Sequence, residues 1–190
     1  MDFITGLPKS EGKSVIMVVV DRLTKYAHFC VVYHPFKART ITNSFMETTQ
    51  ILHGTPNIIV SDRDPIFTGN FWIELFSCLG TLLAHSSSYH PQYDGKTYFL
   101  NKCLEVYLRC LVVDKQTQWV KWLPLVEWWY NTSFHTSTKM TPFMEIYGYH
   151  LPSITYSLRD SSKVQAVEVH MKHQQKVLQI LKDNPNLAKN

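Results

Sequence analysis

Two aspartates lie at the ends of predicted strands, where a mixed sheet would bring their carboxylates together. Asp2 belongs to a short strand-like segment at the start of the chain, and Asp62 follows the buried run 57–61. Carboxylates at strand ends in α/β folds commonly line a functional crevice. Aspartate also commonly caps turns, and Asp64 and Asp21 are further acids at such positions. The spacing of these acids therefore leaves two interpretations open, a reactive pair or turn-forming residues.

A second unusual position is Tyr98, which follows the polar loop 90–95. Beyond this loop, apolar residues recur at helical spacing and define one face of a predicted helix. These residues are Leu100, Leu104, Tyr107, Leu108 and Leu111. The opposite face carries Tyr98, Lys102, Glu105 and Arg109. Because Tyr98 is an aromatic residue on an otherwise charged face, we predict that position 98 belongs to a site.

The elements that would position these residues alternate between strands and helices. Strands are predicted at 2–4, 14–21, 26–33, 57–61 and 82–85. Helices are predicted at 40–53, 70–79, after Gly95, at 119–131, from Thr141, and at 162–182. The run 14–21 is almost entirely β-branched, which is typical of a strand buried on both faces. The order predicts an α/β fold with a mixed sheet.

The composition is that of an ordinary folded domain. With 190 residues, 45% apolar and 13% aromatic, the chain can bury a substantial core and is not a disordered protein. A net charge of +4 permits nucleic-acid binding without requiring it. No apolar run reaches transmembrane length and no secretory signal precedes the domain, so we expect an intracellular protein, not a secreted one. The four cysteines lack metal-ligand spacing, which predicts buried free thiols and no zinc site.

Seven segments, in order along nearly the whole chain, resemble the integrase core of gypsy-type LTR retrotransposon polyproteins. They are MDFITGLPKSEGK, VVVDRLTKYAHF, LHGTPNIIVSDRDPIFTGNFW, SYHPQYDGKTYFLN, LEVYLR, WLPLVEWWYNTSFHTSTKMTPF and YGYHLP. That family is related to retroviral integrases, and the resemblance implies an RNase H-like fold with a five-stranded mixed β-sheet flanked by α-helices. We expect the catalytic core at 1–158, and a long C-terminal linker helix with a tail at 159–190.

The resemblance implies metal-dependent DNA integration, meaning 3′-end processing and strand transfer, in which two aspartates and a glutamate hold Mg²⁺ or Mn²⁺. Carried over by motif, the aspartates are Asp2 and Asp62, and the glutamate would follow the second after 35 intervening residues. The residue at that position is Tyr98. A phenol, with a reference pKa of about 10, stays neutral at pH 7 and is a poor ligand for Mg²⁺. We therefore predict that catalysis is lost or severely reduced.

The resemblance also implies partners. DNA, as retroelement ends and target DNA, would meet Tyr93 and Gln92 in the loop and the basic residues Lys96, Lys102 and Arg109. The alternative to phosphate contact is that these three basic residues belong to the solvent-exposed face of an amphipathic helix. We further expect a homodimer or higher oligomer through a helical face, nuclear localisation, and neither a membrane nor a small-molecule substrate.

Two further expectations concern the whole protein. Members of this family carry a zinc-binding module before the core and often a small β-barrel or chromodomain after it, so we expect the chain to be a fragment of a polyprotein. The alternative to an impaired integrase is a non-catalytic DNA- or partner-binding protein derived from one.

Overall fold

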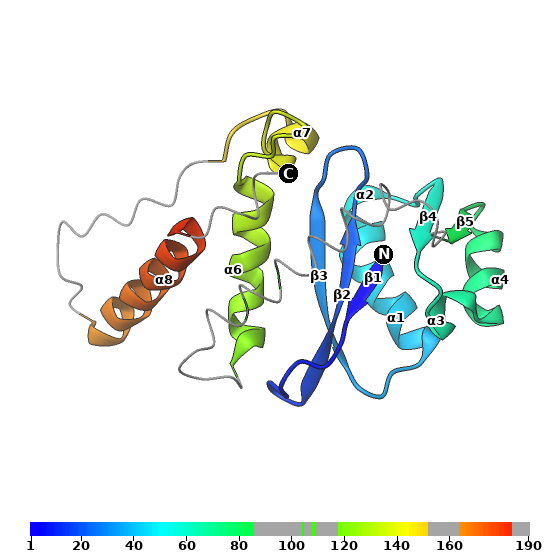
Figure 1. The fold of residues 1–190 in the computed structure, drawn as a ribbon, viewed down its shortest axis with the longest axis horizontal. Helices are drawn as coiled ribbons and strands as arrows, with labels where there is room; N and C mark the ends of the chain where they lie inside the picture. The colour runs from blue at the N-terminus through cyan, green and yellow to red at the C-terminus, as the bar shows by residue number, and fades with distance from the viewer. Residues whose placement is uncertain (86–103, 105–107, 109–117, 152–163, 184–190) are drawn as a thin grey trace.

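The computed structural model describes residues 1–85, 104, 108, 118–151 and 164–183. Three strands form an antiparallel meander: β1 (Asp2–Ile4), β2 (Lys13–Val20) and β3 (Ala27–Tyr33). They occupy the middle of the molecule, with α6 (Trp119–Thr132) on one side and α1 (Ala38–Phe45) on the other, as Figure 1 shows. The predicted α/β class is confirmed.

The central strand β2 is buried on both faces of this sheet, as its sequence predicts. Side chains alternate across a strand, so Ile16 and Val18 project into one core cluster and Val15, Met17 and Val19 into the other. All five are less than one-tenth exposed. A continuous apolar run is therefore required here, because a polar residue at any of these positions would be buried without water.

Two more strands, β4 (Ile58–Ser61) and β5 (Leu82–His85), pair in parallel. The amino group of Met1 donates a hydrogen bond of 2.6 Å to the carbonyl oxygen of Val60, which places the start of β1 beside β4. The described residues thus contain strands at the five predicted places, but their ladders are one of three strands and one of two. A single five-stranded sheet stays a prediction.

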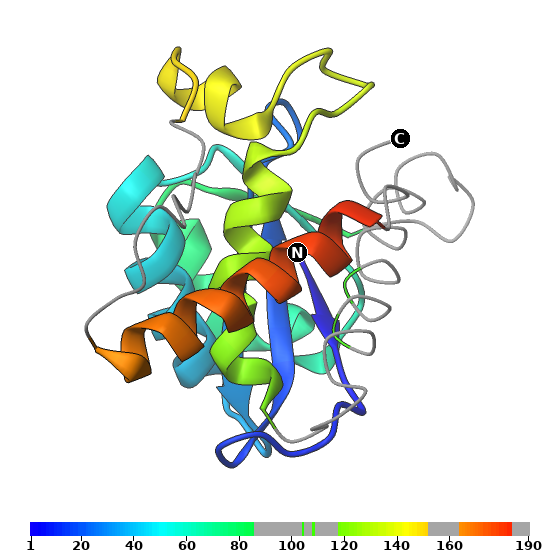
Figure 2. The same ribbon diagram turned by 90° about the vertical axis from the view of Figure 1, so that its left-hand side faces the viewer.

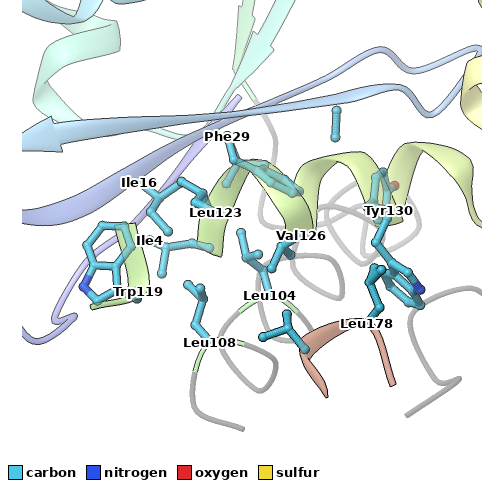
Figure 3. Packing of buried hydrophobic residues seen from close by; sticks show 14 residues of the cluster. Ile4, Ile16, Phe29, Leu104, Leu108, Trp119, Leu123, Val126, Tyr130 and Leu178 are labelled. Carbon is cyan, nitrogen blue, oxygen red and sulfur yellow. The ribbon is translucent and has the colours of Figure 1, made fainter. Parts of the chain in front are cut away.

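One face of the meander is covered by α6, which in turn packs against α8 (Gln165–Asp183), the helix that crosses it in Figure 2. Figure 3 shows the cluster between these layers, in which Ile4 and Ile16 from the sheet meet Trp119 and Leu123 from α6. Leu104 and Leu108 lie in the same cluster and are 1% and 2% exposed. Both are helical, so the predicted apolar face is confirmed at these two positions.

The other face is covered by α1 together with α3 (Pro65–Thr68) and α4 (Asn70–Cys78). The core on this side is rich in fully buried aromatic rings, namely Phe45, Phe67, Trp72 and Phe76. Cys30 is a buried free thiol, as expected, whereas Cys78 is free but exposed, contrary to expectation. Cys78 lies two residues after the buried Phe76, and two residues turn an α-helix by about 200°, so its side chain faces outward.

The predicted single helix 40–53 is divided. It consists of α1, a π-helical turn η1 (Met46–Gln50) and α2 (Ile51–His53). A π-turn inserts one extra residue and rotates the following residues by about 100° around the axis. Leu52, which helical spacing places on the buried face with Ile41 and Phe45, is consequently 60% exposed.

Helix α6 is fixed to the outer edge of β3 by two side chains one turn apart. The amide group of Asn131 accepts from the backbone N–H of Ala27 (2.9 Å) and donates to the carbonyl oxygen of the same residue (2.8 Å). Glu127 Oε2 accepts from the N–H of Phe29 at 2.8 Å. These bonds satisfy edge groups of β3 that would otherwise be open to pairing with another strand. The helix thereby replaces a neighbouring strand.

A short helix, capped at both ends, follows α6. Helix α7 (Pro142–Tyr147) begins at Thr141, whose hydroxyl accepts from Met144 N–H, and ends at Gly148 in a left-handed conformation. In the described ranges, none of the helices is both long enough and apolar enough to cross a membrane.

Candidate active site

The two candidate carboxylates meet where β1 lies beside β4. Asp2 is the first residue of β1, and Asp62 follows Ser61, the last residue of β4. The bond from the Met1 amino group to Val60 holds these two segments together. The carboxyl groups of Asp2 and Asp62 are close enough to share a hydrogen bond. Proximity, which spacing could not establish, is therefore a result of the tertiary fold.

The electrostatics of this pair favour binding of a cation. Burial raises the pKa of the half-buried Asp2 carboxyl, and the charge of Asp62 raises it further, while the N–H of Phe3, at 2.8 Å from Oδ1, acts in the opposite direction. A second carboxylate beside a partly desolvated first one makes the doubly ionised pair costly. A positive ion between them would remove that cost.

The neighbouring acids follow the turn interpretation. Asp64 is the N-cap of α3, and Pro65 is the first residue of that helix. The Oδ1 atom of Asp64 accepts a hydrogen bond of 2.8 Å from the N–H of Ile66. Asp21 accepts from the N–H groups of Leu23 and Thr24 and closes the turn after β2. Both side chains stabilise local backbone structure.

Asp62 combines the two roles. Its Oδ1 accepts from the N–H of Asp64 at 3.1 Å, and its carboxyl group also faces Asp2. The turn bond orients the carboxylate because it restricts rotation of the side chain. The turn formed by residues 62–64 therefore holds the Asp62 carboxylate in an orientation that faces Asp2 in β1.

The donor set of the pair fits Mg²⁺ or Mn²⁺ in part. Carboxylate oxygens are the hard ligands that Mg²⁺ prefers, and two of them face each other here. Within the described ranges, no group of three His, Cys, Asp or Glu side chains could hold a metal ion. Tyr98, the position of the expected third ligand, lies outside the described residues. So do the predicted DNA-binding residues Tyr93, Gln92, Lys96, Lys102 and Arg109.

Replacing Asp2 by asparagine should stabilise the fold modestly near neutral pH. The folded-state pKa of Asp2 is raised, so its contribution to stability is present below the unfolded value of 3.8 and is lost as pH rises through the folded value. Asparagine removes this loss. Because the group is partly exposed, the gain at pH 7 should be at most about 1 kcal/mol. Urea unfolding at pH 7 and pH 3.5 measures it, and an equal gain at both pH values would contradict the electrostatic cause.

A second group of polar side chains was not predicted from the sequence. His28 on β3 lies between Glu127 of α6 and His53 of α2, with its Nδ1 3.1 Å from Glu127 Oε1 and its Nε2 2.9 Å from His53 Nε2. His28 is 8% exposed. A buried imidazole needs hydrogen-bond partners, and Glu127 and His53 supply them here. The available clues were a histidine in an apolar strand and a glutamate on an apolar helix, but their pairing requires contacts across about 100 residues of chain.

No family model matches the chain. The chain is 35% identical over 149 residues to the Transposon Tf2-3 and Tf2-4 polyproteins of Schizosaccharomyces pombe, an overlap that covers 78% of the chain. The same overlap covers 11% of each polyprotein, so the chain corresponds to a small part of those relatives.

Solved structures resemble the fold. A chain of the simian T-cell lymphotropic virus intasome in complex with PP2A regulatory subunit B56 gamma superposes with a TM-score of 0.65 at 16% identity, over 86% of this chain and 58% of that one. The catalytic core domain of BIV integrase gives 0.56 at 19% identity, over 76% and 91%. The HTLV-2 integrase catalytic core domain in complex with magnesium, in its trimeric form, gives 0.54 at 15% identity, over 75% and 92%.

These two comparisons agree with each other and with the arrangement of β1, β4 and the central meander. Sequence similarity covers most of the chain, and the structural likeness extends to integrase catalytic cores with an RNase H-like fold. The chain is homologous to part of the Tf2 retrotransposon polyproteins and has the fold of retroviral integrase catalytic cores.

Proposed function

We propose that this chain is the integrase core of a retrotransposon polyprotein whose DNA integration activity is lost or severely reduced. The observation that carries the proposal is the proximity of Asp2, in β1, and Asp62, just after β4, combined with a tyrosine that follows the second aspartate after 35 intervening residues. Two of the three expected carboxylates lie close together. The third position carries a neutral phenol.

Asp2 and Asp62 would hold the metal between β1 and β4. When bound by carboxylates, divalent ions assist phosphodiester chemistry by stabilising the attacking and leaving oxygens of an in-line displacement. The turn bond from Asp64 to Asp62 would keep one carboxylate oriented, and the partial burial of Asp2 would strengthen its attraction to a cation. The HTLV-2 relative was solved with magnesium, which supports the assignment of metal class.

A metal titration tests whether position 98 is the lesion. The Tyr98→Glu variant should gain about 2–5 °C in melting temperature at 10 mM Mg²⁺ if its affinity is about 1 mM, whereas the unmodified chain should gain little. Tyr98→Gln is the matched control, because it has nearly the shape of glutamate without its charge. A similar gain in all three proteins would contradict the proposed role of Tyr98.

A second candidate function is non-catalytic DNA binding. Tyr98 favours it because a phenol there argues against catalysis, and the net charge of +4 favours contact with phosphates. Phosphate contacts supply sequence-independent affinity that weakens as salt rises. Fluorescence anisotropy with a short duplex should therefore show affinity falling steeply between 50 and 200 mM salt, with the slope reduced by about one unit in Lys102→Gln. Lys172→Gln on α8, whose lysine pairs with Glu168, is the control and should keep the slope. Absence of binding at low salt would exclude this candidate.

The other expectations remain proposals. Dimerisation through a helical face is supported by the HTLV-2 integrase catalytic core domain, which was solved in a trimeric and in a dimeric form, and nuclear localisation is a proposal from the sequence resemblance. Sedimentation of the purified chain and imaging of a tagged chain would measure each directly.

A further inference from the structure

Three elements converge on one buried imidazole away from the aspartate pair. His28 projects from β3, His53 ends α2, and Glu127 comes from the middle of α6. Glu127 uses both oxygens: Oε1 faces His28 Nδ1 at 3.1 Å, and Oε2 accepts from Phe29 N–H at 2.8 Å. The carboxylate is thereby fixed as an acceptor beside His28.

This arrangement determines where the protons lie. Since Glu127 accepts, Nδ1 of His28 carries a hydrogen, and a neutral His28 then has only a lone pair on Nε2. His53 Nε2, 2.9 Å away, must donate its N–H to that lone pair. The two ring centroids are 5.1 Å apart, close to the separation of two imidazoles joined end to end. The contact is a linear hydrogen bond between the rings.

The π-turn explains why His53 reaches this position. Because η1 adds one residue before α2, the end of the helix is rotated toward β3. The bond joins α2 to the sheet at a point where Ile51 and Leu52 are 75% and 60% exposed. These apolar side chains contribute little to docking of this turn, whereas the bond between His28 and His53 joins it directly to β3.

We propose that the His28–His53 pair is a proton-operated latch, which holds the end of α2 on β3 while one proton is shared and releases it when both imidazoles are protonated. One added proton can reside on the outer nitrogen of His53 and leaves the bond intact. A second must occupy Nε2 of His28, which sets two N–H groups and two positive charges against each other. His28 stays in place because Glu127 holds it, so His53 leaves.

Other titratable groups around the pair, within the described part of the chain, set the direction of the response. Burial and the charge of His28 lower the pKa of His53 from its ordinary 6.5, and Asp21 acts in the opposite direction. Tyr26 contacts both rings, with centroids at 5.2 and 5.7 Å, and faces Tyr147 of α7. Burial and Tyr147 raise the pKa of Tyr26 to about 12, so it stays neutral in the range of the latch.

The sign of the effect follows from the lowered pKa of His53. The unfolded chain binds more protons than the folded chain as pH falls through 6.5, so this contribution to stability is present above 6.5 and is lost on acidification. Because release of α2 needs the second proton as well, it should begin only below pH 6.5, where His53 becomes charged. Gly54, which follows α2, bonds through its N–H to the carbonyl of Gln50 and offers a backbone amide that reports on the turn.

Hydrogen exchange of the full chain tests the latch. After correction for intrinsic rates, protection of the amides in 48–57 should fall at least about 5-fold between pH 7.5 and 5.5. His53→Gln should abolish this pH dependence, since a glutamine N–H can donate to His28 without titrating. His170→Gln on α8 is the matched control and should retain the response of the unmodified chain. Unchanged protection in the unmodified chain, or a persistent response in His53→Gln, would overturn the proposal.

A second measurement needs no substitution. In an NMR titration of the unmodified chain, the ring protons of His53 should report a pKa below 6.5, and the amide signal of Gly54 should change at the same or lower pH as the turn is released. A Gly54 amide signal that stays unchanged throughout the acid titration would overturn the latch.

Discussion

Replacing Tyr98 by glutamate should raise Mg²⁺-dependent strand transfer at least about 100-fold above the unmodified chain. A third carboxylate restores hard oxygen coordination beside Asp2 and Asp62, and each 1.4 kcal/mol of transition-state stabilisation corresponds to tenfold in rate. About 3 kcal/mol, a modest value for a metal ligand, gives this factor. The measurement is joining of a labelled duplex end to target DNA, with Mg²⁺ and with Mn²⁺, in a version completed with the flanking modules of a relative.

Two controls make this result specific to the carboxylate. Tyr98→Gln should stay inactive, because it restores size without charge. Tyr98→Glu combined with Asp62→Asn should lose the gain, because two carboxylates again remain. Robust strand transfer by the unmodified chain would contradict the proposal of lost catalysis, while activity in Tyr98→Gln would show that the phenol obstructs the site by its bulk.

Replacing Trp119 by alanine should destabilise the fold by about 3–5 kcal/mol, the usual cost of truncating a large buried aromatic residue. Trp119 is 1% exposed and starts α6 in the cluster that also contains Ile4 and Ile16 (Figure 3). Its Nε1 donates to the carbonyl oxygen of Pro8 at 2.7 Å, which joins α6 to the loop after β1. Loss of this residue removes both packing and that connection.

Trp119→Phe separates the two contributions. Phenylalanine retains most of the packing but loses the hydrogen bond, so the Pro8 carbonyl is left unpaired. The free energy of unfolding should fall by about 1–3 kcal/mol, which is less than for alanine. Trp122→Phe on the same helix is the control, since Trp122 is only partly buried. Urea unfolding followed by fluorescence measures all three variants. Equal losses for alanine and phenylalanine at position 119 would contradict the packing argument.

The positions of the elements could be predicted because their sequence patterns are local. The β-branched run of β2 predicts a strand buried on both faces, and the alternation of its burial follows from strand geometry alone. The apolar spacing around Leu104 and Leu108 predicts a buried helix face in the same way. Thr141-Pro142 and Gly148 predict the start and end of α7 because capping needs only neighbouring residues.

The interruption of the helix 40–53 could not be predicted from periodicity. A π-turn changes the spacing by one residue, and the rotated end is stabilised by contacts with β3 that are remote in sequence, above all His53 with His28. Helical spacing therefore placed Leu52 on the wrong face. The prediction that Cys78 is buried was wrong for a related reason, since an apolar segment does not determine which side of α4 meets the core.

For the candidate site, sequence alone determined the residue types and the interval that ends at Tyr98. It also distinguished an ordinary folded domain from a disordered one, because composition limits what a chain can bury. Tertiary structure decided which acids meet. Asp2 and Asp62 lie 60 positions apart in the chain and come together only because β1 lies beside β4, whereas Asp64 and Asp21 find partners within their own turns. Carboxylates can act as a pair only at contact distance, and that distance is fixed by strand order.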